Sequence, residues 1–402
     1  MSAAAKAFEQ PTGLKVASNA FLVFWLLLAA FPLVWIVFMS VKLPIDSFAP
    51  DALQVVLGYQ TREEVGGLSV LDIAVWIVAL IAAYQLTVRY TGRIAAAIPL
   101  PLPLAWIVAV LAVAVLLVAI LVFVLPAILG IVTGALRAVP VLGLIAEPVI
   151  GNTWQHYRAV WVNNEFSSNF INSLIVTAGV VTVSLTVGTL AGYALARTKT
   201  SLAFWLLIAA LIFRALPHSV LVTGYLPPFI NSAQWLAPLW ENPVTGPFFS
   251  LFSDGPPTFY GKILPVIVVL VAINQPFTIW MLRSFFQNIP EELDEAAMVD
   301  GCSRFQAFRR VIVPVMWPGV ITTGLFSFLL AYNDYLVTSL LLDSQNQTMV
   351  PAITQYFNRE TTTTDQVEAV AAAVSITAPL FLLVMVFQRQ IVSGLTAGAV
   401  KG

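Results

Sequence analysis

Long, uninterrupted apolar runs are the feature that most restricts the fold of this chain. A helix needs roughly 20 predominantly apolar residues to cross the hydrocarbon core of a bilayer, and eight such runs are present. They are too long and too uniformly apolar for the strands of a membrane β-barrel, which are roughly ten residues long and alternate in polarity. We therefore predict an all-α polytopic transmembrane bundle of about eight spans, at residues 20–41, 69–88, 102–125, 172–195, 202–225, 262–282, 318–341 and 368–388.

The composition supports this prediction. The 402 residues are 59% hydrophobic and 10% charged, whereas a soluble domain carries about 25% charged residues. A net charge of -1 argues against nucleic acid as a partner. His156 and His218 are far apart in the sequence and have no ligand-spaced neighbours, so we expect neither a metal site nor a cofactor. The first apolar run has no small-residue cleavage site before Lys42, so it is interpreted as an anchor and not as a signal peptide.

The loop charges indicate an orientation. Cytoplasmic loops of membrane proteins are enriched in Lys and Arg. With the N-terminus inside, most basic residues lie on the cytoplasmic side, among them Arg89, Arg93 and Arg389. The chain is therefore predicted to be N-in and C-in, with residues 284–317 in the cytoplasm. The apolar segment 126–153 is broken by prolines and glycines, and we expect it to be re-entrant or interfacial.

The predicted cytoplasmic segment 284–317 contains a charge-dense stretch that is interpreted as two short helices joined at a turn. Acidic residues follow Pro290, at a helix start where the helix dipole favours them. Gly301 permits the chain to reverse direction, and Pro314 with Pro318 is expected to end the second helix. Apolar residues recur at helical spacing in that second helix, at Phe305, Phe308, Val311 and Ile312. The simplest alternative is an ordinary solvated loop.

A family resemblance favours a docking role instead. Glu295-Ala296-Ala297, three residues, Gly301, nine residues and then Val311-Ile312-Val313-Pro314 resemble the EAA loop of ABC-importer permeases, with Val replacing the Ile and the Leu of that pattern. The resemblance implies a coupling helix that sits in a cleft of a separate cytoplasmic ATPase. We call residues 284–317 the coupling loop. Its implied ATPase-coupling residues are Glu295, Ala296, Ala297, Asp300, Gly301, Arg304, Phe305 and Pro314.

Three further segments resemble carbohydrate-importer permeases. Residues 172–197 are similar to the helix that opens the shared core, and Tyr-Asn-Asp-Tyr at 332–335 falls where the family has a Trp-Asn-Glu/Asp-Phe-like motif. Residues 394–402 resemble the tail of the smaller permease of maltose transporters, which reaches between two ATPase subunits. The implied tail contacts are Gly394, Thr396, Gly398 and Lys401. The tail has no Gly-Lys-Ser/Thr, so this chain is not expected to bind a nucleotide itself.

The resemblance does not extend over the whole chain and suggests three regions. Residues 1–65 would form an N-terminal anchor span with an extracytoplasmic loop, and residues 151–402 the permease core. Residues 66–150 are interpreted as an insertion of two spans at the periphery, against lipid or a partner chain. An insertion of two spans leaves the orientation of the core unchanged. Enlarged permeases of this kind occur, by general resemblance, among α-glucoside importers.

Polar residues within the predicted spans are candidates for the translocation pathway, because intramembrane charge is costly and usually functional. Arg214 is predicted to meet a substrate hydroxyl or an acidic partner such as Asp334; an interfacial position or a pairing with a sister permease is the alternative. Asn274, Gln275, Asn333 and Asp334 are candidates because sugars need hydrogen-bonding groups. The alternative role for these residues is hydrogen bonding between helices.

Together these features predict a permease subunit of an ATP-driven, binding-protein-dependent carbohydrate importer in the bacterial inner membrane. The resemblance implies a heterodimer with a second permease, two ATPase subunits and an extracytoplasmic sugar-binding protein. The chain itself would not be an enzyme. Two alternatives are an ion-coupled secondary transporter or channel, and an ABC permease for a non-sugar solute.

Overall fold

The computed structural model describes residues 12–99, 102–139, 143–198, 200–215, 218–251, 255–358 and 362–397. Within this part, six helices are long and apolar enough to cross a membrane, or seven if one bent pair of helices is a single span. The all-α polytopic fold is thereby confirmed. The six are Gly13–Ser40, Val70–Ala97, Val108–Arg137, Phe166–Arg197, Ile263–Phe286 and Thr363–Val392.

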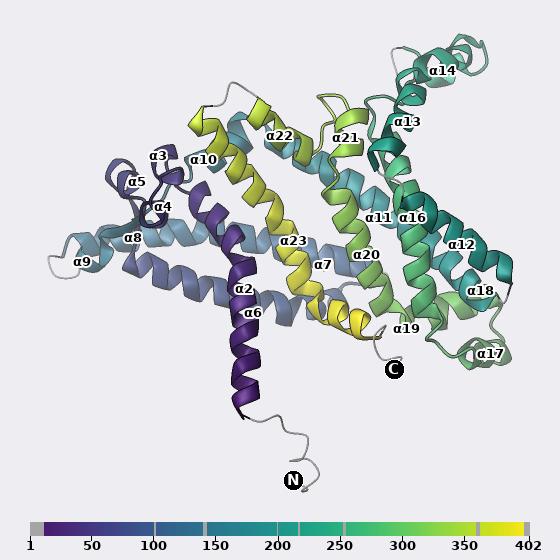
Figure 1. Cartoon of the computed structure of the whole chain (residues 1–402), viewed down its shortest axis with the longest axis horizontal. Coiled ribbons are helices and arrows are strands. Elements are labelled where there is room, and N and C mark those ends of the chain that lie inside the picture. Colours follow the sequence, from purple (N-terminus) through teal and green to yellow (C-terminus); the bar gives the residue numbers. More distant parts are fainter. Residues whose placement is uncertain are drawn as a thin grey trace, which may run out of the picture. The chain divides into compact units, whose positions relative to one another are not determined.

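The elements follow the chain in the order shown in Figure 1. The N-terminal elements are α2 (Thr12–Ser40), α3 (Pro44–Ser47), α4 (Ala52–Leu57), α5 (Tyr59–Glu64), β1 (Gly67–Ser69), α6 (Val70–Ala97), α7 (Leu102–Val118), η1 (Ala119–Val124), α8 (Leu125–Arg137), α9 (Gly143–Ala146), β2 (Pro148–Gly151), α10 (Gln155–Arg158) and η2 (Ala159–Asn163). The C-terminal elements are α11 (Phe166–Arg197), α12 (Ser201–Arg214), α13 (His218–Ile230), α14 (Ser232–Glu241), α15 (Gly246–Phe249), α16 (Ile263–Phe286), α17 (Glu292–Val299), α18 (Arg304–Ala307), η3 (Phe308–Ile312), α19 (Val313–Val315), α20 (Trp317–Tyr332), α21 (Leu336–Leu341), α22 (Met349–Asn358) and α23 (Thr363–Ala397).

The span count differs from the predicted eight at two places. Residues 202–225 fall into two shorter helices, α12 and α13, and the sequence between these helices contains Pro217. Residues 318–341 divide into α20 and α21 at 333–335. Each resulting helix is shorter than a full span.

The segment after residue 125 also differs from its prediction as a re-entrant piece. The helix α7 continues through the π-helical stretch η1 into α8, giving one apolar helix over Val108–Arg137. Pro126 lies directly after the π-helical stretch, and a proline inside a helix has no N–H to donate to the preceding turn. A widened π-helical turn before a proline lets the helix pass the point at which the sequence indicated a break.

Contacts divide the chain into two compact units, and the first comprises residues 1–79, 123–163 and 356–375. Its two strands, β1 and β2, pair antiparallel with Gly67 opposite Gly151. A Cβ at Gly67 would lie 2.0 Å from the Ile150 carbonyl oxygen, so this close backbone approach requires glycine. The two ends of the predicted insertion 66–150 therefore meet in one small sheet.

The outer segment (residues 41–69 and 148–158) belongs to this first unit and buries several polar groups. Lys42 is fully buried and its Nζ donates to the Gly151 carbonyl. The Asp46 carboxylate is also buried, and it accepts from the backbone N–H and the hydroxyl of Thr61, both at 2.7 Å. An imidazole nitrogen of His156 lies 2.9 Å from the Lys42 carbonyl oxygen. These groups are satisfied within the segment itself.

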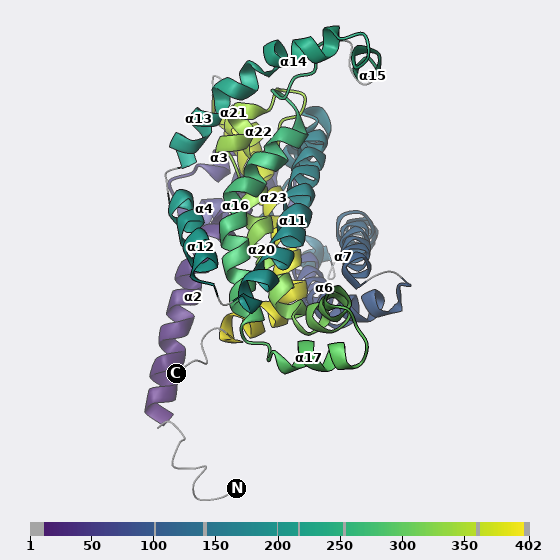
Figure 2. The same ribbon diagram turned by 90° about the vertical axis from the view of Figure 1, so that its right-hand side faces the viewer.

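The second unit comprises residues 80–122, 164–355 and 376–402 and holds the main core. Helices α11, α16 and α20 run side by side in it (Figure 2). Small residues allow the close approach of α11 and α16: a Cβ at Gly188 would lie 2.6 Å from Thr278 Cγ2. The core residues are Val176, Val180, Val222, Val266, Val269, Leu270, Ile273, Ala331, Val337, Leu341 and Leu342.

Candidate functional site

The coupling loop is built as predicted around a turn at Gly301. Helix α17 ends there, with Gly301 in the left-handed region at φ 88°. The N–H of Cys302 donates to the Ala297 carbonyl and that of Gly301 to the Met298 carbonyl, both at 3.0 Å. This pair of bonds is a Schellman C-cap, which satisfies two terminal carbonyls of the helix.

The second helix of the loop begins at a capping box. Ser303 Oγ accepts from the Gln306 N–H at 3.3 Å, and the Gln306 side chain accepts from the Ser303 N–H at 2.8 Å. This reciprocal pair satisfies donors that a helix start leaves open. The predicted stop at Pro314 is wrong, because the helix passes through η3 and Pro314 to Val315 before it bends by 77° into α20. Pro314 has no N–H to donate to the preceding turn, and the turn before it is π-helical.

The inner face of the coupling loop is apolar and packed. Phe308 and Ile312 are buried as predicted, whereas Phe305 is 63% exposed. A π-helical stretch holds more residues per turn than an α-helix, so the apolar positions before and within it do not share one face. The rings of Phe308 and Tyr193 lie 4.8 Å apart. An apolar cluster around Phe308 joins the loop to α16 and α20. Its buried members are Leu282, Phe286, Ile289, Phe308, Ile312, Met316 and Val320.

An ion pair between Arg197 and Asp294, which the sequence did not indicate, connects α17 to the end of α11. Asp294 is buried, and its Oδ1 accepts from the Tyr193 hydroxyl at 2.7 Å. Arg197 Nε donates to Asp294 Oδ2 at 2.9 Å, and Nη2 lies 2.7 Å from the same oxygen. Arg197 Nη1 also donates to the carbonyls of Phe286 and Ile289. Helical spacing could have indicated that Asp294 faces inward. Asp294 and Ala297 are three residues apart, so they share one face of α17, and they are its buried residues.

The outer face of the coupling loop is exposed. Glu295 lies on it together with Val299, which is 87% exposed, and Phe305. Of the other predicted coupling residues, Ala297 is buried against the inner face. The remaining predicted residues are exposed: Ala296, Asp300, Gly301, Arg304 and Pro314. The loop therefore presents carboxylates, cations and apolar side chains from one supported surface.

The predicted pathway residues do not converge on one point. Arg214 lies over the ring of Phe277, 4.5 Å from its centroid. Among the residues with described structure the ion pair is Arg197 with Asp294, so the considered pairing of Arg214 with Asp334 is not seen. Asn274 is buried and donates to Ser327 Oγ at 2.8 Å, a bond between α16 and α20.

Two buried oxygen atoms of α16 have no hydrogen-bond partner among the residues that the structure describes. Gln275 Nε2 donates weakly to the Ser184 carbonyl at 3.4 Å, while its Oε1 is buried without a hydrogen bond. The Oδ1 of Asn274 is in the same state. Buried polar atoms of this kind usually have a partner. They are the features of α16 most compatible with a polar pathway.

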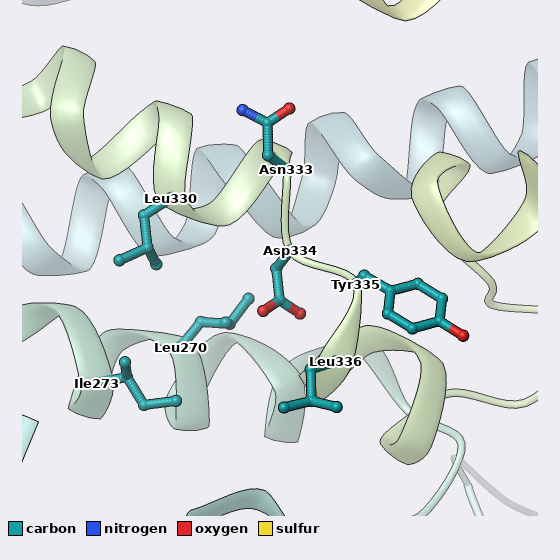
Figure 3. Close-up of a pocket in the computed structure, with 7 residues that line it drawn as sticks. All are labelled: Leu270, Ile273, Leu330, Asn333, Asp334, Tyr335 and Leu336. Carbon is teal, nitrogen blue, oxygen red and sulfur yellow. The ribbon is translucent and has the colours of Figure 1, made fainter. Parts of the chain in front are cut away.

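Asn333 and Asp334 line a cavity of about 300 Å³ at the break between α20 and α21. The Asp334 carboxylate points toward α16, whereas the Asn333 side chain points away from it (Figure 3). Asp334 Oδ1 accepts from the Thr338 N–H at 3.0 Å, which caps the start of α21. The remaining lining residues are Leu270, Ile273, Leu330, Tyr335 and Leu336.

The C-terminal prediction falls at the limit of the described structure. Helix α23 runs to Ala397, so the backbone at Gly394 and Thr396 is helical. Gly398 and Lys401 lie outside the described residues. Within the described part of the chain, no group of three or more His, Cys, Asp or Glu side chains is placed to hold a metal ion.

Comparison with known proteins identifies the class of protein. The family described as "Binding-protein-dependent transport system inner membrane component" matches residues 184–396, more than half of the chain. This chain belongs to that family: it is a multi-pass protein of the bacterial inner membrane and a component of a transporter, not an enzyme. The family resemblance seen in the coupling loop is thus confirmed.

Individual relatives support the same assignment. The trehalose transport system permease protein SugB of Mycobacterium tuberculosis is 34% identical over 62% of this chain and 82% of its own length. The diacetylchitobiose uptake system permease protein DasC of Streptomyces coelicolor is 32% identical over 62% and 81%. The trehalose/maltose transport system permease protein MalG of Thermococcus litoralis is 30% identical over 59% and 76%.

Proposed function

We propose that this chain is one of two permease subunits of an ATP-driven importer for an oligosaccharide, and that a separate ATPase drives it through the coupling loop. A heterodimer with a second permease, two ATPase subunits and an extracytoplasmic sugar-binding protein complete the proposed assembly. Membership in a binding-protein-dependent transport family supports this assembly over an ion-coupled carrier or channel.

The observation that carries the coupling role is the contrast between the two faces of the loop. Its inner face is packed against the rest of the unit through the Arg197–Asp294 ion pair and the buried ring of Phe308. Its outer face exposes Glu295, Val299 and Phe305. Large apolar side chains exposed beside charges on a supported surface are typical of a protein interface.

The same contacts explain how a displacement of the loop would reach the membrane. Asp294 ties α17 to α11, and the apolar cluster around Phe308 ties the loop to α16 and α20. Close-packed interiors transmit displacement because they are not readily compressible. When the ATPases close, the loop is proposed to carry α11, α16 and α20 with it, which exchanges inward and outward access. The C-terminal residues Gly394, Thr396, Gly398 and Lys401 are proposed to reach the ATPase as well.

For the substrate we favour an α-linked glucoside. Two relatives carry trehalose in their names, one of them with maltose, while a third carries diacetylchitobiose, which is β-linked. Sugars require hydrogen-bonding groups along the route, and α16 offers Asn274 and Gln275. Arg214, Asn333 and Asp334 are proposed as further pathway residues. A non-sugar solute is the competing substrate class.

A charge reversal tests the coupling role. Co-expression of the Glu295→Lys chain with the ATPase and second permease from its own transport system is expected to lower ATPase co-purification and binding-protein-stimulated hydrolysis by roughly tenfold or more, because an unfavourable charge at an interface costs at least about 1.4 kcal/mol. Glu64→Lys, which reverses another exposed acid, on α5, is the matched control and is expected to leave both unchanged. Wild-type co-purification with Glu295→Lys would contradict the coupling role.

A transport assay tests the substrate. The assembled complex in proteoliposomes, supplied with its binding protein and internal ATP, is expected to take up radiolabelled trehalose or maltose. Diacetylchitobiose serves as the β-linked comparison. Uptake of the β-linked sugar alone would overturn the α-glucoside assignment, and uptake of none of these with uptake of a non-sugar solute would overturn the carbohydrate assignment.

A further inference from the structure

A basic pocket of about 260 Å³ lies in the second unit, apart from the coupling loop and from the pathway residues. Three arginines contribute to it: Arg89 and Arg93 from α6 and Arg389 from α23. None of the three has an ion-pair partner among the described residues, and the lining includes no Asp or Glu. The full lining is Thr87, Val88, Arg89, Thr91, Gly92, Arg93, Trp106, Val386, Gln388, Arg389 and Gln390.

The pocket is shaped by an aromatic contact between α7 and its neighbours. Trp106 packs against Gly92 of α6, where a Cβ would lie 3.5 Å from the indole Cη2 atom. The ring centroids of Trp106 and of Phe387 on α23 are 5.4 Å apart. The indole of Trp106 therefore contacts both α6 and α23 where it lines the pocket.

The two threonines of the pocket do not compete with its arginines for a ligand, and the Gln388 amide donates to the Met385 carbonyl of its own helix. The hydroxyls of Thr87 and Thr91 are buried and donate to carbonyls of their own helix, at 2.8 and 2.7 Å. Arg89 and Arg93 are four residues apart and share one face of α6. Like charges on one helix face repel each other unless an anion lies between them. The pocket thus offers concentrated, uncompensated positive charge.

We propose that this pocket binds the phosphate headgroup of an anionic phospholipid. Guanidinium groups match phosphate oxygens with paired hydrogen bonds, and basic pockets between membrane helices are typical sites for acidic headgroups. Arg93 lies in the last turns of the α6 span and Arg389 near the end of the Thr363–Val392 span, so both are near the depth of headgroups. The predicted orientation puts these ends on the cytoplasmic side.

The surroundings favour a lipid over a free phosphate or an acidic peptide. The helices that form the pocket expose large apolar side chains: Leu86 on α6 is 46% exposed, and Leu111 and Val115 on α7 are 56% and 68% exposed. These apolar faces can pack against the acyl chains of a lipid. A soluble anion would interact with the arginines alone. Bound lipid would join α6 and α7, the helices of the predicted insertion, to α23, which would give that insertion a role.

Native mass spectrometry of the purified full chain tests the site. In detergent with equal amounts of dioleoyl phosphatidylglycerol and dioleoyl phosphatidylcholine, wild type is expected to retain phosphatidylglycerol preferentially, and less so at high salt. The triple variant Arg89→Gln, Arg93→Gln, Arg389→Gln is expected to retain it roughly 100-fold more weakly, because each basic residue contributes about fivefold. The double variant Arg309→Gln, Arg310→Gln removes exposed arginines of the coupling loop and is expected to retain lipid like wild type.

Further arms of the experiment distinguish a lipid site from a site for free phosphate. Arg389→Lys keeps the charge and is expected to lose less than Arg389→Gln, while elution volume and melting temperature check that each variant is folded. Inorganic phosphate is offered alone in the same assay. Retention of phosphate without preference for phosphatidylglycerol over phosphatidylcholine would overturn the lipid assignment, as would unchanged phosphatidylglycerol retention by a folded triple variant.

Discussion

The outer segment and the coupling loop both connect apolar helices. They differ in whether their polar side chains are buried or exposed. The outer segment buries Lys42, Asp46 and Thr61 and satisfies them internally. The coupling loop buries Asp294 and leaves its neighbour Glu295 exposed. A segment whose polar groups hydrogen-bond to each other has few of them left for a partner. A segment that exposes polar groups on a well-packed base is suited to bind another protein.

The two buried acids are also held differently. Asp294 faces the guanidinium of Arg197, a formal counter-charge. For Asp46, burial alone raises the carboxyl pKa, but hydrogen bonds from Thr61, Gln54 and Gln60 outweigh it, so its pKa is lowered. Removing Asp294 therefore leaves Arg197 without its ion-pair partner, whereas removing Asp46 leaves the neutral donors that bind it and takes a negative charge away from buried Lys42.

The largest effect is expected from breaking the charge pair. Asp294→Ala leaves Arg197 uncompensated and should destabilise the packing of the loop by about 3 kcal/mol, at the low end for a buried pair because the two side chains keep 17% and 12% exposure. Hydrogen exchange of amides in residues 290–317 measures this. Glu292→Ala removes an exposed acid from the same helix and should change exchange by less than about 0.5 kcal/mol. Equal exchange in the two variants would contradict the anchoring role.

The outer segment should show a pH response that comes from the buried side chain of Lys42. Burial lowers the pKa of Lys42 from 10.5 to about 8, so between these values the unfolded chain binds more protons at this site than the folded chain. The free energy of unfolding should then rise with pH across this window, by at most about 1.4 kcal/mol per pH unit. Melting temperatures of wild type and Lys42→Met between pH 7 and 10 test this, and an identical pH slope in the variant would refute it.

Substitutions at Gly301 should destabilise the turn of the coupling loop through backbone strain and not through steric overlap. A Cβ at Gly301 would meet nothing within 4 Å, but its φ of 88° is unfavourable for side-chain-bearing residues. Gly301→Val should cost about 1–2 kcal/mol and reduce ATPase co-purification, while Gly301→Asn, which tolerates this region better, should cost less. If both variants couple like wild type, the shape of the turn does not matter for docking.

The smallest effect is expected at the start of the second loop helix. Ser303→Ala removes the acceptor for the Gln306 N–H and should cost about 1 kcal/mol or less. Ser303→Asp keeps a capping oxygen and is the matched control. Helix content in a peptide would be too low to measure, so hydrogen exchange of residues 303–307 in the full chain is the suitable readout. Protection that is equal in both variants would show that the cap is dispensable.

The sequence was most informative where a local pattern has a local cause. The turn at Gly301 and the burial of Phe308 and Ile312 followed from glycine geometry and helical spacing. It was less informative at prolines, since Pro126 and Pro314 are accommodated by π-helical turns whose formation depends on packing. The roles of the predicted coupling, pathway and tail residues stay predictions.

Sequence alone determined that this chain is a helical membrane protein, because burying an apolar run in lipid requires only length and composition. It also determined the family, through the spacing from Glu295 to Pro314. Only the tertiary structure decided that Asp294, and not Glu295, faces inward to Arg197 and Tyr193, and that Arg89 and Arg93 share a pocket with Arg389. These contacts join residues far apart in the chain, and a one-dimensional pattern carries no information about which distant side chains meet.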